Sequence, residues 1–181
     1  MKKLKNSELN RISVNEFKNS SKTPLIVILD NIRSAHNVGS IFRTCDAFLI
    51  NQIFLCGITA IPPNKEIRKT ALGSTESVDW KYFENIVEVV KNLKKEGYHI
   101  IAIEQANESI KLENFKTDNN KKYAVIFGNE VNGIDQNVMD ICNNVIEIPQ
   151  FGTKHSLNVS VSAGIIIWDI FSKITFNQSD L

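Results

Sequence analysis

The sequence contains few of the residues that mark specialised classes of protein. Only 8 glycines and 4 prolines occur among 181 residues, which excludes a collagen-like or low-complexity chain. Its cysteines are few and far apart, at Cys45, Cys56 and Cys142. Because no two of them have metal-ligand spacing and their number is odd, we interpret them as free thiols in a reducing compartment. The sequence therefore predicts neither a disulfide framework nor a metal site.

An excess of charge of one sign is also absent. Lys and Arg total 21 against 20 Asp and Glu, so the formal net charge is +1. Proteins that bind nucleic acid often carry a strong basic excess, because neutralising phosphates releases counterions. Any binding to nucleic acid must therefore depend on a local basic face, or on a dimer that concentrates one.

The sequence predicts neither a signal peptide nor a membrane-spanning segment. The N-terminus, MKKLKNSELN, is basic but contains no apolar stretch. The longest apolar stretch, residues 157–171, is interrupted by polar residues and falls short of the ~20 residues that a bilayer requires. We expect a soluble, cytoplasmic protein without membrane contact.

Common motifs for nucleotide binding and nucleophilic catalysis are missing. No GxGxxG follows the first predicted strand and no GxxxxGK[ST] occurs, which argues against a Rossmann dinucleotide site and a P-loop. No nucleophile elbow is present. The histidines lack metal-ligand spacing. We interpret His99 as structural, whereas His36 and His155 adjoin polar loops and are candidates for contact with substrate.

Short apolar runs alternate with helical patterns along the chain. Near-continuous apolar runs predict strands of a parallel sheet covered on both faces, over residues 25–29, 52–56, 98–103, 123–127 and 145–148. Helices are expected between and after them, over 38–48, 65–72, 85–95 and 157–173. The last helix is apolar almost all round, so we expect it to be buried on several sides. This alternation predicts one α/β domain over residues 23–176, preceded by a basic arm, 1–22.

Polar residues follow three of the predicted strands, where open α/β sheets bind ligands. These segments are 30–48, 127–135 and 148–160. Taken singly, several of their residues have ordinary interpretations: Asn37 and Ser156 as helix caps, and Arg43 as a solvated helix charge. Glu130 directly after a strand and Asn158 in the first turn of an apolar helix are less routine. The residues alone predict a polar site built from three strand ends.

The three segments resemble the signature motifs of the SpoU family, also called TrmH-like, within the SPOUT superfamily of RNA methyltransferases. The first motif resembles NVGSIFR at 37–43, the second FGNE at 127–130 with Gly133, and the third IP at 148–149, Gly152 and SLNVS at 156–160. The segments KTALGSTES at 69–77 and AIEQ at 102–105 are similar to the family as well. The resemblance extends over roughly residues 24–171, and three motifs in order are specific. Cys45 and Asp46 depart from the pattern, because small residues are common there.

The resemblance implies an α/β fold whose C-terminal part forms a deep trefoil knot. In this family the knot forms the pocket for S-adenosylmethionine, and the knotted regions pack together in a homodimer. The residues of this chain that would contact the cofactor are Glu104, Gln105, Gly128, Asn129, Gly133, Ile148 and Leu157.

The activity that the resemblance implies is S-adenosylmethionine-dependent methylation of a ribose 2′-hydroxyl in RNA. Arg43 takes the central role. Because a guanidinium does not readily deprotonate, it would clamp a substrate phosphate and stabilise the developing alkoxide, with that phosphate a candidate acceptor for the proton. Glu130 would orient Arg43 or its polar neighbours, and Asn37, Ser156 and Asn158 would fix the ribose and the arginine. In such dimers the arginine can serve the cofactor held by the other subunit.

The substrate is expected to be tRNA, with rRNA as the second candidate. The residues proposed to contact RNA are His36, Arg68 and Lys69, with the basic arm that carries Lys2, Lys3, Lys5 and Arg11. Two alternatives stay open: an RNA-binding protein of this fold without catalysis, and a methyltransferase that modifies a base. The presence of Asn37, Arg43, Glu130, Ser156 and Asn158 favours an enzyme, and the complete motif set favours ribose.

Overall fold

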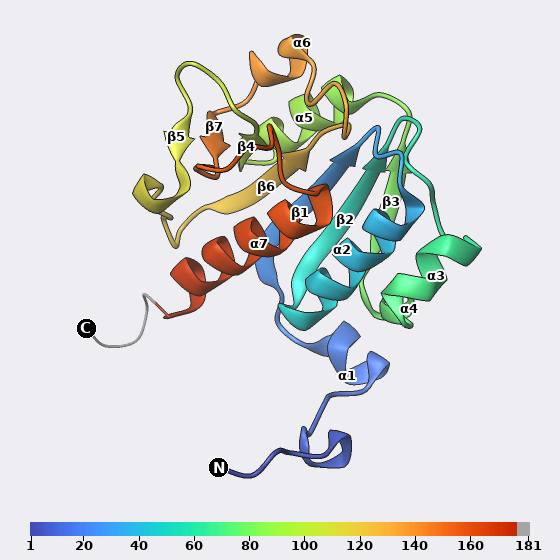
Figure 1. Ribbon diagram of the computed structural model, residues 1–181. Coiled ribbons are helices and arrows are strands. Elements are labelled where there is room, and N and C mark those ends of the chain that lie inside the picture. The colour runs from blue at the N-terminus through green and yellow to red at the C-terminus, as the bar shows by residue number, and fades with distance from the viewer. Residues whose placement is uncertain (177–181) are drawn as a thin grey trace.

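A seven-stranded sheet lies between two layers of helices in the computed structural model, which describes residues 1–176 (Figure 1). The strand order is β3-β2-β1-β6-β4-β7-β5, and all neighbouring strands run parallel. The strands are β1 (Thr23–Asp30), β2 (Ile50–Cys56), β3 (Trp80–Phe83), β4 (Tyr98–Ile103), β5 (Ile110–Lys111), β6 (Lys122–Phe127) and β7 (Asn144–Glu147). The predicted α/β class with a parallel sheet is confirmed.

Helices and short 3-10 turns precede, connect and follow the strands. The helices are α1 (Val14–Asn19), α2 (Ala35–Ala47), α3 (Lys65–Ala71), α4 (Ser74–Ser77), α5 (Ile86–Lys95), α6 (Gln136–Met139) and α7 (Val159–Phe176), and the 3-10 turns are η1 (Asn6–Glu8) and η2 (Leu112–Asn114). Each strand and helix predicted from the sequence is present. Strands β3 and β5, which the apolar pattern does not predict, form the two edges of the sheet. Edge strands are covered incompletely, so they lack the continuous apolar run that identified the others.

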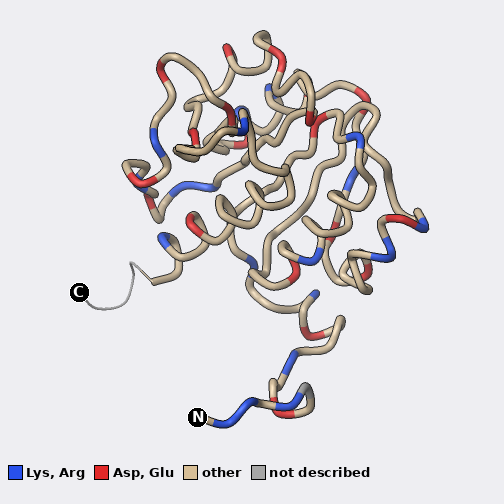
Figure 2. Tube along the Cα trace, viewed as in Figure 1, with Lys and Arg blue, Asp and Glu red and all other residues tan. Residues whose placement is uncertain are grey.

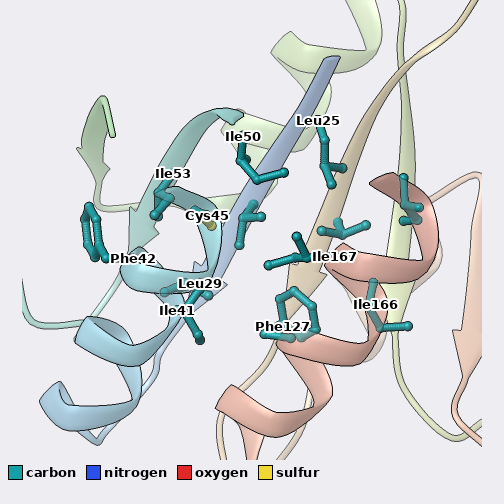
Figure 3. Packing of buried hydrophobic residues seen from close by; sticks show 14 of the residues in the cluster. Leu25, Leu29, Ile41, Phe42, Cys45, Ile50, Ile53, Phe127, Ile166 and Ile167 are labelled. Carbon is teal, nitrogen blue, oxygen red and sulfur yellow. The ribbon is translucent and has the colours of Figure 1, made fainter. Parts of the chain in front are cut away.

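Burial on both faces explains the continuous apolar strands. In β1, Leu25, Val27 and Leu29 pack on one face of the sheet with α2 and α7, whereas Ile26 and Ile28 pack on the other face with α5 and α6. Figure 3 shows the first of these layers, in which Ile41 and Phe42 of α2 and Ile166 and Ile167 of α7 meet the strands. Because successive residues alternate between the faces, each strand contributes to both layers.

Helix α7 buries one face and exposes the other. Ala163, Ile166, Ile167, Ile170 and Ile174 are buried on the sheet, whereas Val161, Ile165, Trp168 and Phe176 are 37–54% exposed. The expected burial on several sides is therefore not met in the single chain. By length and composition alone α7 could cross a membrane, although core helices of soluble proteins pass the same test. We call the exposed residues Val161, Ile165, Trp168 and Phe176 the outer face of α7.

The N-terminal segment extends away from the sheet (Figure 1). Its helix α1 begins with a capping box formed by Ser13 and Glu16, and Phe17 anchors it in the core. Basic residues occur along the arm, but over the visible face of the molecule they are interspersed with acidic ones (Figure 2). The division into an arm, 1–22, and a domain, 23–176, stays a prediction.

Candidate active site

A cavity of about 600 Å³ opens beyond the carboxyl ends of β4, β6 and β7. Ligand pockets commonly have about 300–1,000 Å³, so the cavity is large enough for a nucleoside-sized molecule. Every residue predicted to contact a cofactor lines it, namely Glu104, Gln105, Gly128, Asn129, Gly133, Ile148 and Leu157. Three of the predicted catalytic residues, Glu130, Ser156 and Asn158, line it too. Within residues 1–176, no group of His, Cys, Asp and Glu could hold a metal ion.

A tight turn after β6 forms one wall of the cavity. The backbone groups of Asn129 and Gly133 exchange two hydrogen bonds, of 3.1 and 2.9 Å. Gly133 has a φ of +68°, and a Cβ there would lie 2.2 Å from Oε2 of Glu104. Only glycine permits both this conformation and this approach. The turn therefore brings its backbone directly against the carboxylate at the end of β4.

Glu104 and Gln105 connect this turn to the loop before α7. The carboxylate of Glu104 accepts the backbone N–H of Ile134 (3.2 Å) and of Gln105 (2.9 Å). The side-chain amide of Gln105 donates to the carbonyl oxygen of His155 (2.7 Å). Segments 104–105, 128–134 and 155–158 thus form one continuous wall, although they are far apart in the sequence.

Glu130 is the centre of a hydrogen-bonded array that joins the β6 turn to the start of α2. Its carboxylate accepts the backbone N–H of Arg33 (2.9 Å), the backbone N–H of Ser34 (3.1 Å) and the side-chain amide of Asn37 (3.2 Å). Partial burial acts to raise the pKa of Glu130, but the hydrogen bonds outweigh it and hold the pKa below its ordinary value. Glu130 is therefore ionised at neutral pH.

Asn37 links this array to α7. The side-chain amide of Asn158 donates to Oδ1 of Asn37 (3.2 Å). Asn158 also caps α7, because its Oδ1 accepts the backbone N–H of Ser160 (2.9 Å). Ser34 caps α2 by accepting the N–H of Asn37. The helices thus begin at Ala35 and Val159, and the cap interpretations of Asn37 and Ser156 are wrong.

Arg43 lies apart from this array. It is exposed on α2 and lines a separate groove of about 450 Å³. The other residues of this groove are Ser40, Thr44, Ala47, Phe48, Lys69 and Thr70. Of the residues that the structure describes, those lining the 600 Å³ cavity do not include Arg43. A single chain therefore does not bring Arg43 to Glu130, Ser156 and Asn158.

His36 and Lys69 share one carboxylate. Nε2 of His36 lies 2.9 Å from Oε2 of Glu66, and Nζ of Lys69 lies 2.8 Å from Oε1 of the same residue. The hydrogen bond from Lys69 is the main reason that the pKa of Glu66 lies below its ordinary value. Arg68 is exposed on the same helix, α3. The proposed RNA-contacting residues thus lie together at the α2–α3 surface, with an acidic residue among them.

Comparison with known proteins identifies the family. The family model described as the SpoU rRNA Methylase family matches residues 24–168. The chain belongs to the SpoU family. It is 32% identical over 151 residues to 23S rRNA (guanosine-2′-O-)-methyltransferase RlmB of Neisseria meningitidis, an alignment covering 83% of this chain and 59% of that protein. The chain therefore spans less than two thirds of that relative's length.

Solved structures of SpoU proteins have the same fold. The TrmH/SpoU tRNA modifying enzyme of A. aeolicus superposes with a TM-score of 0.80 and 27% identity, over 91% of this chain and 84% of that one. An AdoMet-bound rRNA methyltransferase from Sinorhizobium meliloti superposes with a TM-score of 0.76 and 25% identity, over 85% and 59%. The predicted family is confirmed.

The SpoU motifs meet at one edge of the sheet, as predicted, but several participating groups lack a sequence signature. The donors to Glu130 from Arg33 and Ser34 are backbone N–H groups. The side-chain amide of Asn129 donates to the backbone carbonyl of Asn31 (2.8 Å). Backbone groups are the same at every position, so only their place directly after β1 could have indicated these roles.

Proposed function

We propose that this protein transfers a methyl group from S-adenosylmethionine to a ribose 2′-hydroxyl in RNA. The observation that carries the proposal is the Glu130–Asn37–Asn158 array at the cavity, because it joins all three SpoU motifs at a space suited to a nucleoside. The guanosine-2′-O activity in the name of the Neisseria relative supports ribose over a base as the acceptor.

The cavity has the features that S-adenosylmethionine requires. The turn at 128–133 lines the cavity, and a Cβ on Gly133 would collide with the carboxylate of Glu104, which lines the same cavity. Ile148 and Leu157 supply apolar surface for the adenine ring. The carboxylate of Glu104 lies beside the turn, where it can accept a hydrogen bond from a cationic or hydroxyl group of a ligand. When bound, the cofactor supplies a methyl group that is already activated on a sulfonium.

The chain's own residues position and activate the acceptor. A 2′-hydroxyl becomes nucleophilic when its proton is drawn away. Arg43 holds a substrate phosphate and stabilises the developing alkoxide, and this phosphate accepts the proton. Ser156 and Asn158 hold the ribose at the cavity, while ionised Glu130 fixes Asn37 and, through it, Asn158.

A homodimer accounts for the separation of Arg43 from the cavity. The outer face of α7 is apolar and exposed, and large exposed apolar patches mark interaction sites. Trp168 on this face lies 5.4 Å, between ring centroids, from Phe48, which also lines the Arg43 groove. A partner packed on α7 would therefore meet the Arg43 groove, so that Arg43 of one subunit serves the cavity of the other. The deep trefoil knot is part of the same proposal.

The proposed substrate is tRNA, with rRNA second, and the proposed location is the cytoplasm. The A. aeolicus neighbour is described as a tRNA modifying enzyme, whereas the Neisseria relative acts on 23S rRNA. RNA would contact the α2–α3 surface with His36, Arg68 and Lys69, and the basic arm. Because Glu66 pairs with two of these side chains, a phosphate must compete with its carboxylate there.

Arg43→Ala tests this function against binding without catalysis. If Arg43 acts in the transition state, the variant should lose ~10²–10³ in turnover and keep its affinity for S-adenosylmethionine. Arg43→Lys should recover little, because a point charge lacks the planar two-pronged contact. The assay is mapping of 2′-O-methylated nucleotides in total tRNA and rRNA, with Lys91→Ala on the opposite helix layer as the control. Wild-type turnover in Arg43→Ala refutes the mechanism, and wild-type protein that binds RNA and cofactor without methylating it refutes the function.

A further inference from the structure

We infer that Asn31 and Thr59 are positioning residues for Glu130. The inference rests on the proposed function, since it assigns Glu130 a part in the reaction. Neither residue lines the 600 Å³ cavity, so neither touches the ligand that the cavity would hold. Both act through the loop between β1 and α2, whose backbone N–H groups hold the Glu130 carboxylate.

Asn31 connects three segments of the chain. Its backbone N–H donates to the carbonyl of Cys56 (3.2 Å), and its Oδ1 accepts the N–H of Ile58 (3.2 Å). Its Nδ2 donates to Oδ1 of Asp30 (3.0 Å). Its own carbonyl accepts the side-chain amide of Asn129, the residue before Glu130 (2.8 Å). Asn31 therefore connects the end of β2 both to the loop that donates to Glu130 and to Asn129, which precedes Glu130.

The backbone of Asn31 is held in an uncommon conformation. Its φ is +55°, in the left-handed region that residues with a Cβ adopt at a cost. Such conformations persist where the surrounding structure fixes them, and they occur frequently at functional sites. Here the turn directly after β1 redirects the chain, so that the N–H groups of Arg33 and Ser34 point to Glu130.

Thr59 fixes the next residue of the same loop. Its hydroxyl is buried, donates to the carbonyl of Leu29 (3.0 Å) and accepts the N–H of Ile32 (2.9 Å). The hydroxyl thus holds the loop on both sides of Asp30 and Asn31. Two consecutive loop residues, Asn31 and Ile32, are therefore anchored to the turn after β2, directly before the two that bind Glu130.

The consequence is a path from the turn after β2 to the cavity. Ile58 and Thr59 hold Asn31 and Ile32, and the loop that follows holds Glu130 through Arg33 and Ser34. Removing either side-chain anchor should change the direction of the two N–H groups, whereas the carbonyl of Asn31 that holds Asn129 stays in place and Glu104, Gln105 and Ile148 of the cofactor pocket contact neither anchor. The reaction should then slow, while cofactor affinity stays the same.

Asn31→Gly and Thr59→Val test this inference, with Thr59→Ser as the conservative variant. Glycine keeps the left-handed backbone and removes the side-chain anchor, whereas valine removes the hydroxyl with little change of volume. We expect kcat to fall ~10–100-fold, because small misplacements of reacting groups have effects of this size. KM for S-adenosylmethionine should stay near the wild-type value, and Thr59→Ser should retain most of kcat. Asn85→Gly, which removes the same side chain from the groove that Asn31 lines, is the matched control.

Hydrogen exchange of the Arg33 and Ser34 amides separates this inference from the proposed function. Both amides should exchange ~10-fold faster or more in Asn31→Gly than in wild type and Asn85→Gly, since their bonds to Glu130 weaken. Unchanged exchange of these amides overturns the inference. This result does not depend on methylation, so it can be read even if the wild-type protein methylates no RNA and the proposed function fails. If the wild type is active, faster exchange with unchanged kcat also overturns the inference. A fall in kcat that merely follows a loss of cofactor affinity or a lower Tm overturns it as well.

Discussion

Replacing Gly133 with alanine should weaken the fold and the cofactor site together, because one added methyl group perturbs both. Gly133 has a φ of +68°, and its new Cβ would lie 2.2 Å from Oε2 of Glu104. The carboxylate must then move, and its hydrogen bonds from the N–H groups of Ile134 and Gln105 weaken. Glu104 lines the cavity, so its displacement changes the proposed cofactor pocket.

The magnitude follows from two contributions. A left-handed backbone costs a residue with a Cβ about 1–2 kcal/mol. Hydrogen bonds to a charged group contribute ~1.5–3 kcal/mol each, but water reaches this open site and replaces part of them, so we assign about 1 kcal/mol to the loss. The free energy of unfolding should fall by about 2–3 kcal/mol, which lowers Tm by roughly 5–10 °C in a chain of this size. Affinity for S-adenosylmethionine should fall about tenfold or more, equivalent to ~1.4 kcal/mol.

Gly97→Ala separates the two contributions. Gly97 also has a positive φ, +82°, but within residues 1–176 no heavy atom beyond its chain neighbours lies within 4 Å of the Cβ position. This variant should lose only the ~1–2 kcal/mol of backbone strain and keep full cofactor affinity. Thermal unfolding and titration calorimetry on both variants provide the comparison. Equal losses of stability in the two variants, with cofactor affinity retained in Gly133→Ala, would refute the proposed contact between Gly133 and Glu104.

Two further predictions concern the dimer and a buried carboxyl. Trp168→Glu should give half the wild-type mass in light scattering, because it places a charge on the outer face of α7, whereas Tyr82→Glu on edge strand β3 should not; an unchanged mass contradicts the proposed interface. Burial raises the pKa of Asp30 from 3.8 to about 6. The contribution of the protonated Asp30 carboxyl to the free energy of unfolding is therefore fully present below pH 3.8, and it is lost as the pH rises through 6. Asp30→Asn should therefore raise the free energy of unfolding at pH 8 by up to about 2–3 kcal/mol, with little gain at pH 4; an equal gain at both values contradicts the assignment.

The sheet was predictable from the sequence where burial leaves a strong pattern. Strands β1 and β6 are buried on both faces, and their apolar runs located them within two residues at either end. Strands β3 and β5 left no such pattern, since edge positions accept polar residues. For helices, the apolar face located α2 and α7 but not their first residues. Those depend on the caps formed by Ser34 and Asn158, and several neighbouring residues had equal cap propensity.

The cavity was predictable because its motifs combine residue types with special properties. The positive φ at position 133 requires glycine. The backbone N–H groups that face position 130 favour a carboxylate there. Asn31 and Thr59 carry no comparable signal. An asparagine after a strand is common in turns, and a threonine with a buried hydroxyl is identified only by the two partners that folding brings to it.

Neither the sequence nor the structure of a single chain brings Arg43 to the cavity. Arg43 is proposed to take part in the reaction because of its place in the first motif, yet it lies in a groove separate from the cavity. The start of α2 is fixed against Glu130 and Asn158, and Arg43 lies about two turns further along the helix, away from this array. In the proposed dimer, the cavity of a second copy comes to Arg43. The apolar outer face of α7, adjacent to the same groove through Trp168 and Phe48, is the surface on which a second copy would bring it.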